Sequence, residues 1–428
     1  MPLHYTWLPA ASPEVNNPLH IIKTDGSHLI TKSGAEIYDA ISSWWCKPLG
    51  YRHPLIIESI TAQLQEFDHH MAANIYNDVI EELSYTLASL TPGMNKVMYA
   101  SDGSSAIEIA MKLSYEARII NGEYKRNKYV ALTNAYHGET IFALSTCGIN
   151  IYRNRYADLL QQNYFITNIP YVNSRHDPLW NDCNFAYLHY EQFFANIASS
   201  TTALIIEPIV QGAAGIKIIS RNFLINLITI AKKYAIHIIC DEIMVGLGRL
   251  GCHSVTHDIL QENVDFICFA KNLTAGTIPM SAVVINRSIT ELFVNQQKTF
   301  LHSHTHSCNV LGAKVALSYL QFLNNSNLLS TVNECEPMLL QLMNTVASEF
   351  DFVINPRAIG AIAACDLMLS DTVIQAIFNI AIQQKIYLRP IGKTLYLMPP
   401  LYNLKQDLDE IGDKFYNTFI AIKNLVCN

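Results

Sequence analysis

The chain has 428 residues, half of them apolar, which is enough to bury a large core and favours two or three domains. Its net charge of -7 and pI near 6.1 give no basic footprint for nucleic acid or an anionic membrane surface. Charged residues make up only 15% of the chain, a low share that favours an oligomer with buried apolar surface.

Targeting and redox signals are few. No stretch reaches the roughly 18 apolar residues of a membrane-spanning helix, and the start M-P-L-H-Y-T-W-L-P lacks the basic and apolar regions of a signal peptide. Ten cysteines are scattered without a C-x-x-C pair, and several lie inside apolar strands. These features predict a reduced cytoplasmic protein without a zinc site.

The predicted elements fall into two groups along the chain. Residues 19–41 predict a short β meander, with turn signals at T-D-G and K-S-G. Beyond residue 55, strands alternate with helices, which predicts a mainly parallel sheet covered by helices on both faces. The expected strands are 95–100, 128–135, 202–209, 235–241, 264–270 and 280–286, and the expected helices are 78–90, one beginning at Ser104, and 221–234.

Beyond about residue 310 the pattern changes. Long helical patterns at 309–324, 331–349, 371–384 and 405–424 enclose short strands at 352–354, 361–366, 386–389 and 394–398. This part predicts a smaller α+β domain, and the N-terminal meander is expected to join it because a short β ribbon is not stable alone. The expected divisions are 1–50 and 311–428 for the small domain and 51–310 for the large one.

Two charged residues end apolar, strand-like runs. Asp241 closes A-I-H-I-I-C-D and Lys271 closes D-F-I-C-F-A-K. The carboxyl ends of parallel strands converge on the ligand crevice of an α/β sheet, so both side chains are expected there. A lysine and a carboxylate in one crevice suit pyridoxal phosphate, through a Schiff base to the amine and a salt bridge to the ring nitrogen. The alternative is a structural ion pair.

Two loops after strands carry further candidates. In Y-A-S-D-G-S-S, Gly103 and Ser104 begin a helix whose free N–H groups favour a phosphate, although an ordinary capped helix has the same pattern. In N-A-Y-H-G, Tyr136 and His137 follow a strand, where an aromatic ring can stack on a planar cofactor. A surface Tyr-His pair is the alternative.

Other motifs indicate a pocket wall. Glu207 ends the apolar run L-I-I-E-P beside a glycine-rich turn. It is expected to be a buried acid of the site, and a role in an ion pair is the alternative. In S-S-W-W, taken as strand, at most one of Trp44 and Trp45 can be simple core. Arg389, between short strands, can clamp a substrate carboxylate or form a surface ion pair. H-S-H-T-H (302–306) lacks a nearby carboxylate and is expected to be a polar loop, with no metal bound.

Taken together, these segments resemble the class-III group of fold-type I aminotransferases, which depend on pyridoxal 5'-phosphate. The motifs Y-H-G, E-P-I-x-Q-G-x-x-G, D-E-I-x-x-G-x-G-R-x-G and A-K-N-L-T-A-G-T-I-P occur in the family's order over essentially the whole chain. The resemblance implies an α/β fold with a mainly parallel central sheet and a smaller α+β domain. It also implies a homodimer with shared active sites.

The resemblance assigns roles by position. Lys271 matches the Schiff-base lysine and proton shuttle, Asp241 the partner of the ring nitrogen, and Tyr136 the residue stacked on the ring. The remaining cofactor contacts would come from Gly103, Ser104, His137, Glu207 and, from the partner subunit, Thr305. The substrate pocket would hold Tyr5, Trp44, Trp45, Tyr136, Lys271, Ser303 and Arg389, with Arg249 near the site.

Three features are similar to the biotin-pathway subgroup, which uses S-adenosylmethionine as amino donor and 8-amino-7-oxononanoate as acceptor. They are H-Y-T near the start, S-S-W-W, and R-P-I-G-K-T-L-Y-L-M-P-P. Lysine or an ω-amino acid as donor is the first alternative, and a catalytically silent binding protein is the second. Two departures from the family concern phosphate binding: Asp102 stands before the glycine, and Ser303 replaces a glycine. Asp102 is compatible with a phosphate site if it turns away to cap the helix.

Overall fold

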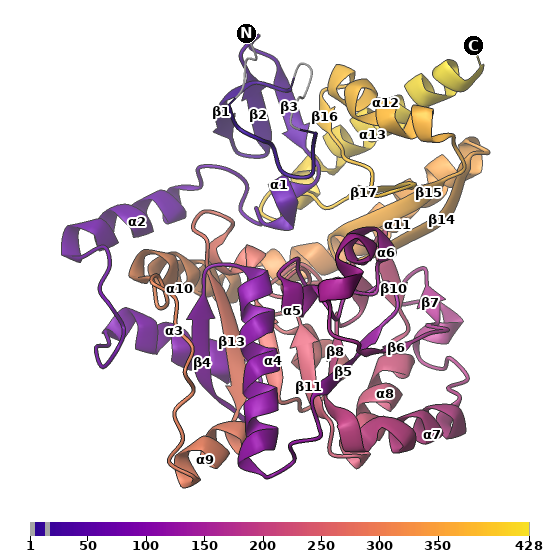
Figure 1. Ribbon diagram of the computed structural model, residues 1–428. Coiled ribbons are helices and arrows are strands. Elements are labelled where there is room, and N and C mark those ends of the chain that lie inside the picture. Colours follow the sequence, from indigo (N-terminus) through magenta and orange to yellow (C-terminus); the bar gives the residue numbers. More distant parts are fainter. Residues whose placement is uncertain (1–4, 13–17, 428) are drawn as a thin grey trace.

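The computed structural model describes residues 5–12 and 18–427. Its centre is a seven-stranded sheet in the order β4-β13-β12-β11-β8-β5-β6 (Figure 1). The strands are β4 (Met94–Ala100), β5 (Lys128–Leu132), β6 (Tyr164–Ile166), β8 (Thr201–Ile206), β11 (His237–Asp241), β12 (Phe266–Phe269) and β13 (Ser281–Asn286). Only β13 is antiparallel to its neighbours, β12 and β4, so the sheet is mainly parallel as predicted.

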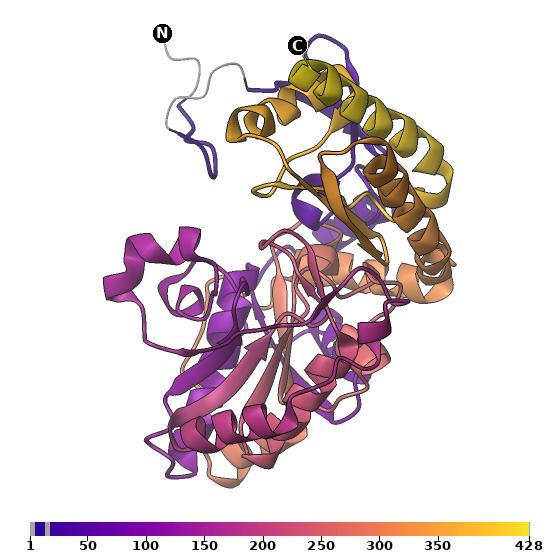
Figure 2. The ribbon, with the colours of Figure 1, turned by 90° about the vertical axis from the view of Figure 1, so that its right-hand side faces the viewer.

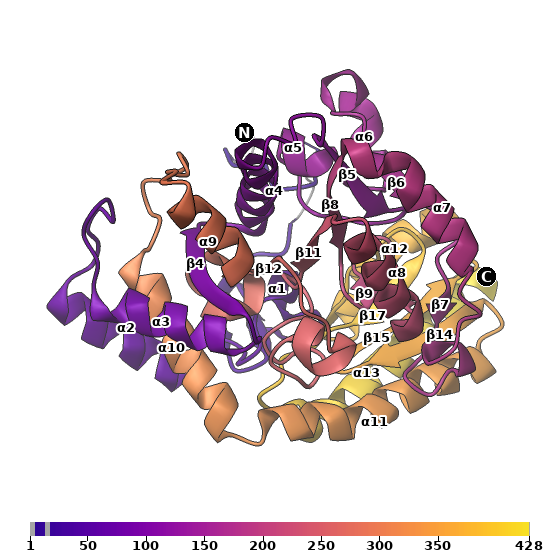
Figure 3. The same ribbon diagram turned by 90° about the horizontal axis from the view of Figure 1, so that it is seen from below.

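Alternate side chains of each strand enter two different cores. In β11, Ile238 and Cys240 join one apolar cluster while Ile239 joins the other, and all three are fully buried. One face packs on α4 (Gly103–Ile120), α5 (Ile141–Leu144) and α9 (Arg287–Asn295). The other packs on α3 (Asp78–Ser89), α8 (Arg221–Lys233) and α10 (Val310–Asn325), and Figure 3 shows helices on both sides of the sheet. Burial on both faces explains the continuous apolar runs.

The small domain combines the two ends of the chain. Strands β14 (Val353–Ile359), β15 (Ile362–Leu367) and β17 (Thr394–Leu397) form an antiparallel sheet beside α11 (Leu328–Glu349), α12 (Asp371–Gln383) and α13 (Leu404–Cys427). The meander β1 (Ile21–Asp25), β2 (His28–Thr31) and β3 (Glu36–Asp39) is extended by β16 (Ile386–Tyr387), parallel to β3. Figures 1 and 2 show these indigo strands against the orange and yellow C-terminal elements. The predicted fold class is therefore confirmed.

Several elements were not predicted. They are α2 (Pro54–Glu66), α6 (Asn150–Arg153), α7 (Tyr187–Ile197), α5, α9 and β6, and a small sheet of β7 (Tyr171–Val172), β10 (Lys217–Ile219) and β9 (Val210–Gln211). Most have only two to four residues, too few to show an apolar period. No helix in the described ranges has the length and apolar character needed to cross a membrane. All ten cysteines are free thiols.

The prediction that S-S-W-W is a strand was wrong. Ser42–Trp45 is a tight turn, α1, in which Ser42, Ser43 and Trp45 all have positive φ. The Asp39 carboxylate causes the bend, because it accepts the N–H of Ile41 at 3.2 Å and the N–H of Ser43 at 2.5 Å. The turn still directs the two tryptophans apart: Trp45 is 7% exposed and Trp44 is 49% exposed.

Candidate active site

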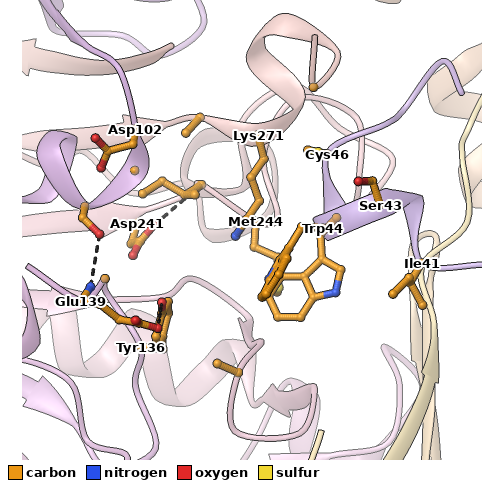
Figure 4. A pocket seen from close by; sticks show the side chains of 18 of the residues that line it. Ile41, Ser43, Trp44, Cys46, Asp102, Tyr136, Glu139, Asp241, Met244 and Lys271 are labelled. Atoms are coloured by element: carbon orange, nitrogen blue, oxygen red, sulfur yellow. Dashed lines mark hydrogen bonds between the residues drawn. The ribbon is translucent and has the colours of Figure 1, made fainter. Parts of the chain in front are cut away.

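A cavity of about 890 Å³ lies where the carboxyl ends of the parallel strands meet the small domain (Figure 4). Its large-domain wall includes the residues that end β11 and follow β4, β5, β8 and β12, as expected for a mainly parallel sheet. The small domain adds α1 and the segment after β16. The predicted site residues that line it are Trp44, Trp45, Gly103, Ser104, Tyr136, His137, Glu207, Asp241, Lys271 and Arg389.

Asp241 is a fixed carboxylate at the cavity floor. It is 5% exposed, and its Oδ2 atom lies 2.8 Å from Nδ1 of His137, which is also buried. Its Oδ1 atom accepts the N–H of Ile243 at 3.2 Å. The Nε2 atom of His137 is buried and makes no hydrogen bond within the described residues. Because two contacts orient it, the Asp241 carboxylate can pair with a cationic nitrogen in the cavity without rearranging.

Lys271 begins a short 3-10 helix directly after β12, with a positive φ of 41°. Its Nζ atom lies 4.9 Å from the centroid of the Trp45 ring, and Figure 4 shows the chain reaching into the cavity. Burial lowers the pKa of this amine, while the nearby carboxylates of Asp241 and Glu207 oppose that shift. A lowered pKa increases the neutral fraction, which is the nucleophilic form of lysine.

The N-terminus of α4 forms a cradle for an anion. Asp102 caps the helix, since its Oδ1 accepts the N–H of Ser105 at 2.9 Å and its Oδ2 accepts the Ser105 hydroxyl at 2.7 Å. The N–H groups of Gly103 and Ser104 lie in the first turn, where a helix offers donors without intrahelical partners. A Cβ atom on Gly103 would lie 2.9 Å from Cδ1 of Ile243, so a side chain there would crowd the cradle.

The Y-H-G turn packs against this helix terminus. Gly138 has a φ of +124°, and a Cβ atom there would lie 2.2 Å from the Ser104 hydroxyl oxygen, so only glycine allows the close approach. The next residue, Glu139, donates its N–H to the same hydroxyl at 3.2 Å. The Tyr136 hydroxyl donates to Glu139 Oε1 at 2.9 Å. Tyr136 therefore lies on the same side of the cavity as the anion cradle.

Glu207 holds the backbone rather than another side chain. Its Oε2 accepts the N–H of Tyr136 at 2.9 Å, and its Oε1 accepts the N–H of Gly212 at 3.0 Å. Burial raises the pKa of this carboxyl to about 7; the electrostatic interaction with His137 opposes the rise, and the Asp241 carboxylate adds to it.

The small domain supplies an aromatic and cationic wall. The Arg389 guanidinium carbon lies 4.6 Å from the centroid of the Trp44 ring, in stacking range. Arg389 forms no ion pair with an acidic side chain in the described part of the chain. Trp45 donates its indole N–H to the Tyr396 hydroxyl at 2.9 Å. This wall suits an elongated substrate with an apolar body and a carboxylate.

Four residues assigned by resemblance do not line the cavity. Tyr5 is fully exposed, although Pro9 and Ala10 of the same segment do reach the cavity. Thr305 and Ser303 are exposed, and Ser303 lines a separate hollow with Phe300. Arg249 is completely buried beneath α1, where its guanidinium donates to the Pro399 carbonyl at 2.6 Å. Arg249 therefore has a structural role in the single chain.

The histidine-rich segment forms its own contacts. His302 Nε2 lies 2.9 Å from Nε2 of His304, and its Nδ1 lies 2.9 Å from Nζ of Lys112. Burial and the nearby Lys112 charge lower the pKa of His302. Within the described ranges, no group of three His, Cys, Asp or Glu residues is arranged to hold a metal ion.

Sequence reasoning missed several lining residues. Glu139 directly follows Y-H-G, and its position three residues after Tyr136 was a usable signal for a third acid in the site. Met244 lines the cavity beside Trp45, and no local signal marked it as a site residue. Tyr152, Cys46 and Tyr396 also line the cavity, and no local pattern distinguishes them from ordinary core residues.

The class-III aminotransferase family model matches residues 10–419. The chain is similar to two adenosylmethionine-8-amino-7-oxononanoate aminotransferases. The one from Synechococcus elongatus is 31% identical over 427 residues, covering 96% of this chain and 97% of the relative. The one from Helicobacter pylori is 29% identical over 410 residues, covering 93% and 92%.

Two solved structures are similar to this chain over nearly its whole length. A PLP-bound amine transaminase from an uncultivated Pseudomonas species has a TM-score of 0.89 at 25% identity, covering 98% of this chain and 99% of that one. An adenosylmethionine-8-amino-7-oxononanoate aminotransferase from Methanocaldococcus jannaschii shares the fold, with a TM-score of 0.89 at 24% identity and coverage of 98% and 97%. The family-model match over residues 10–419, together with the geometry of the cavity, shows that the chain belongs to the class-III aminotransferases.

Proposed function

We propose that this chain is a pyridoxal-phosphate-dependent aminotransferase of biotin biosynthesis. It converts 8-amino-7-oxononanoate to 7,8-diaminononanoate, with S-adenosylmethionine as the amino donor. The observation that carries the proposal is the pairing of Lys271 and Asp241 in one cavity beside the anion cradle of α4. The substrate assignment is supported by the biotin-pathway names of relatives that match this chain almost end to end.

The residues present fit pyridoxal phosphate. The cradle of Gly103 and Ser104 suits its phosphate, Asp241 suits its protonated ring nitrogen, and Tyr136 suits its ring face. The lowered pKa of Lys271 suits condensation with its aldehyde. When bound, pyridoxal phosphate supplies an electron sink that stabilises negative charge on the carbon next to the reacting nitrogen.

The chain's own residues supply proton transfer and orientation. Lys271 Nζ takes the proton from the amine-bearing carbon of the donor and, in the second half of the reaction, returns a proton to the former ketone carbon of the acceptor. His137 holds the Asp241 carboxylate in place through its 2.8 Å contact. Arg389 receives the carboxylates of donor and acceptor in turn, while its planar guanidinium rests against the Trp44 ring.

Lys271→Ala tests the covalent role. The variant should lose the visible absorbance of lysine-bound cofactor together with turnover, while the cavity and fold persist. Lys393→Ala, at an exposed lysine outside the cavity, is the matched control and should retain both. A Lys271→Ala protein that keeps the absorbance and the activity would refute the assignment.

The donor is tested by absorbance changes of cofactor-loaded protein with S-adenosylmethionine, lysine or ornithine, first alone and then with 8-amino-7-oxononanoate. The proposal requires a response to S-adenosylmethionine that the acceptor reverses. A response to lysine with none to S-adenosylmethionine would assign the chain to a lysine-dependent transaminase. No response to any donor in protein that takes up no pyridoxal phosphate would indicate a silent binding protein.

The proposed function includes a cytoplasmic homodimer with shared active sites. The exposed segment with Ser303 and Thr305 would complete the cradle of the partner subunit, which is consistent with its absence from the cavity of a single chain. Mixing inactive Lys271→Ala and Thr305→Ala chains should restore activity, because one site of a mixed dimer then has both residues intact. No recovery in mixed dimers would exclude a shared site.

A further inference from the structure

Glu207 joins two loops of the cavity wall that follow the neighbouring strands β5 and β8. It follows β8 and is 7% exposed. One carboxylate oxygen accepts the N–H of Tyr136, 71 residues earlier in the chain, at 2.9 Å. The other accepts the N–H of Gly212, five residues later, at 3.0 Å. Both oxygens are therefore engaged by backbone donors.

The Gly212 contact fixes a packed stack of residues. A Cβ atom on Gly212 would lie 2.3 Å from Sδ of Met244 and 3.2 Å from Cζ3 of Trp45, so the backbone of Gly212 touches both side chains closely. The Trp45 ring in turn lies 4.9 Å from Nζ of Lys271. Displacement of Gly212 would therefore shift the surface against which the reactive amine rests.

The same two segments are joined a second time. The Gln211 side chain is fully buried and donates from Nε2 to the Thr133 carbonyl at 2.9 Å. The Tyr171 hydroxyl donates a hydrogen bond to Oε1 of Gln211 at 2.7 Å and in turn accepts one from Nδ2 of Asn134 at 2.9 Å. Side chains of segment 207–212 thus hold the backbone of segment 133–136 in place through hydrogen bonds.

We infer that Glu207 is a positioning residue, which holds Tyr136 and the Gly212–Met244–Trp45 stack in place in the cavity wall without contacting substrate or cofactor. The inference rests on the proposed function for the identity of the reaction. It replaces the direct cofactor contact that family resemblance assigns to Glu207 with an indirect role through the backbone. Its structural part is measurable in protein without cofactor.

Glu207→Gln is the informative variant. It preserves volume, but its amide has one acceptor oxygen, so one of the two backbone N–H groups would face an NH2 group instead. Glu207→Asp keeps the charge but is one methylene too short to reach both donors. The control is Asp265→Asn, at a half-buried carboxyl directly before β12. This carboxyl accepts one backbone N–H, from Ile238 at 2.7 Å, which an asparagine oxygen can still accept.

Hydrogen–deuterium exchange of the cofactor-free proteins is the first measurement. Amides of segments 134–138 and 210–214 should exchange roughly tenfold faster in Glu207→Gln, because a hydrogen bond to a charged acceptor is lost. Glu207→Asp should accelerate amide exchange in at least one of the two segments. Asp265→Asn should leave exchange in both segments unchanged. Unchanged exchange in both Glu207 variants would overturn the inference.

Kinetics of the loaded enzyme give the second measurement. Glu207→Gln should retain the absorbance of bound cofactor and lower kcat by about 10- to 100-fold with little change in KM, since misplacement of about 1 Å has effects of this size. Loss of cofactor binding with unchanged exchange would show direct ligation and contradict the inference. If the wild type transaminates nothing, the proposed function fails while the exchange measurement still decides the role of Glu207.

Discussion

The most specific prediction concerns Arg389 and the carboxylate it is proposed to bind. Arg389→Leu removes the guanidinium but keeps an apolar side chain against Trp44. In the structure the guanidinium carbon lies 4.6 Å from the Trp44 centroid, and no acidic side chain in the described residues pairs with it. The charge therefore has no internal partner, and its hydrogen-bonding capacity is available for a ligand.

The magnitude follows from this geometry. A hydrogen bond to a charged group contributes about 1.5–3 kcal/mol, so removing the guanidinium should lower kcat/KM for a carboxylate substrate by about 10- to 150-fold. Arg389→Lys keeps the charge but loses the planar fork, and we expect roughly a tenfold loss. Trp44→Ala removes only the stacking contact, which at a half-exposed site contributes about 0.5–1 kcal/mol and predicts a loss of about two- to fivefold.

The assay compares 8-amino-7-oxononanoate with its methyl ester in the second half of the reaction. The ester has the same chain but no carboxylate, so Arg389→Leu should leave its kcat/KM nearly unchanged while that of the acid falls. Equal losses for acid and ester would mean that Arg389 supports the cavity wall instead of binding the carboxylate. No loss for either would remove Arg389 from the substrate site.

Three further predictions concern the cradle and the buried acid. Asp102→Asn keeps a cap for the Ser105 N–H but removes a negative charge, whose repulsion of a phosphate is about 1 kcal/mol at about 4 Å in water. Titration of cofactor-free protein should therefore show about two- to fivefold tighter binding of pyridoxal phosphate; weaker binding would contradict this. Gly103→Ala should weaken that binding at least about fivefold, because its Cβ would lie 2.9 Å from Ile243, and unchanged affinity would refute the cradle. The pKa of Glu207 is raised from 4.5 to about 7, so between these values the folded cofactor-free protein binds more protons than the unfolded chain. Its unfolding free energy should therefore fall by up to about 3 kcal/mol as pH rises from 4.5 to 8, relative to Glu207→Gln in urea titrations; a parallel pH dependence of the two proteins would exclude this source.

The parts of the fold that were predicted are those with strong local signals. The strand ending at Asp241 was expected at 235–241 and is found at His237–Asp241, because β11 is buried on both faces and reads as a continuous apolar run. The helix from Gly103 follows from its cap at Asp102 and its long apolar stripe. The residues at these strand ends and at this helix terminus line the cavity, as expected from these local signals.

The parts that were missed depend on contacts between distant segments. The turn at Ser42–Trp45 contains no glycine, the residue that would have indicated positive φ angles. Its bend comes from the Asp39 carboxylate, which also accepts a hydrogen bond from the Tyr51 hydroxyl at 2.7 Å. A composition-based reading cannot distinguish such a carboxylate from a solvated one. The small sheet of β7, β9 and β10 consists of strands of two or three residues, which are too short to show a period.

The two walls of the cavity differ in how far the local sequence determines them. The amine of Lys271 and the acid of Asp241 are delivered by neighbouring parallel strands, so any chain with this sheet order and these strand ends brings them together. The substrate wall instead depends on long-range contacts, such as the hydrogen bond between Trp45 and Tyr396, 351 residues apart. If that wall binds substrate as proposed, changes there would alter the accepted substrate while Lys271 and Asp241 stay in place. The acceptor experiments on Trp44 and Arg389 therefore test specificity independently of the experiments on Lys271.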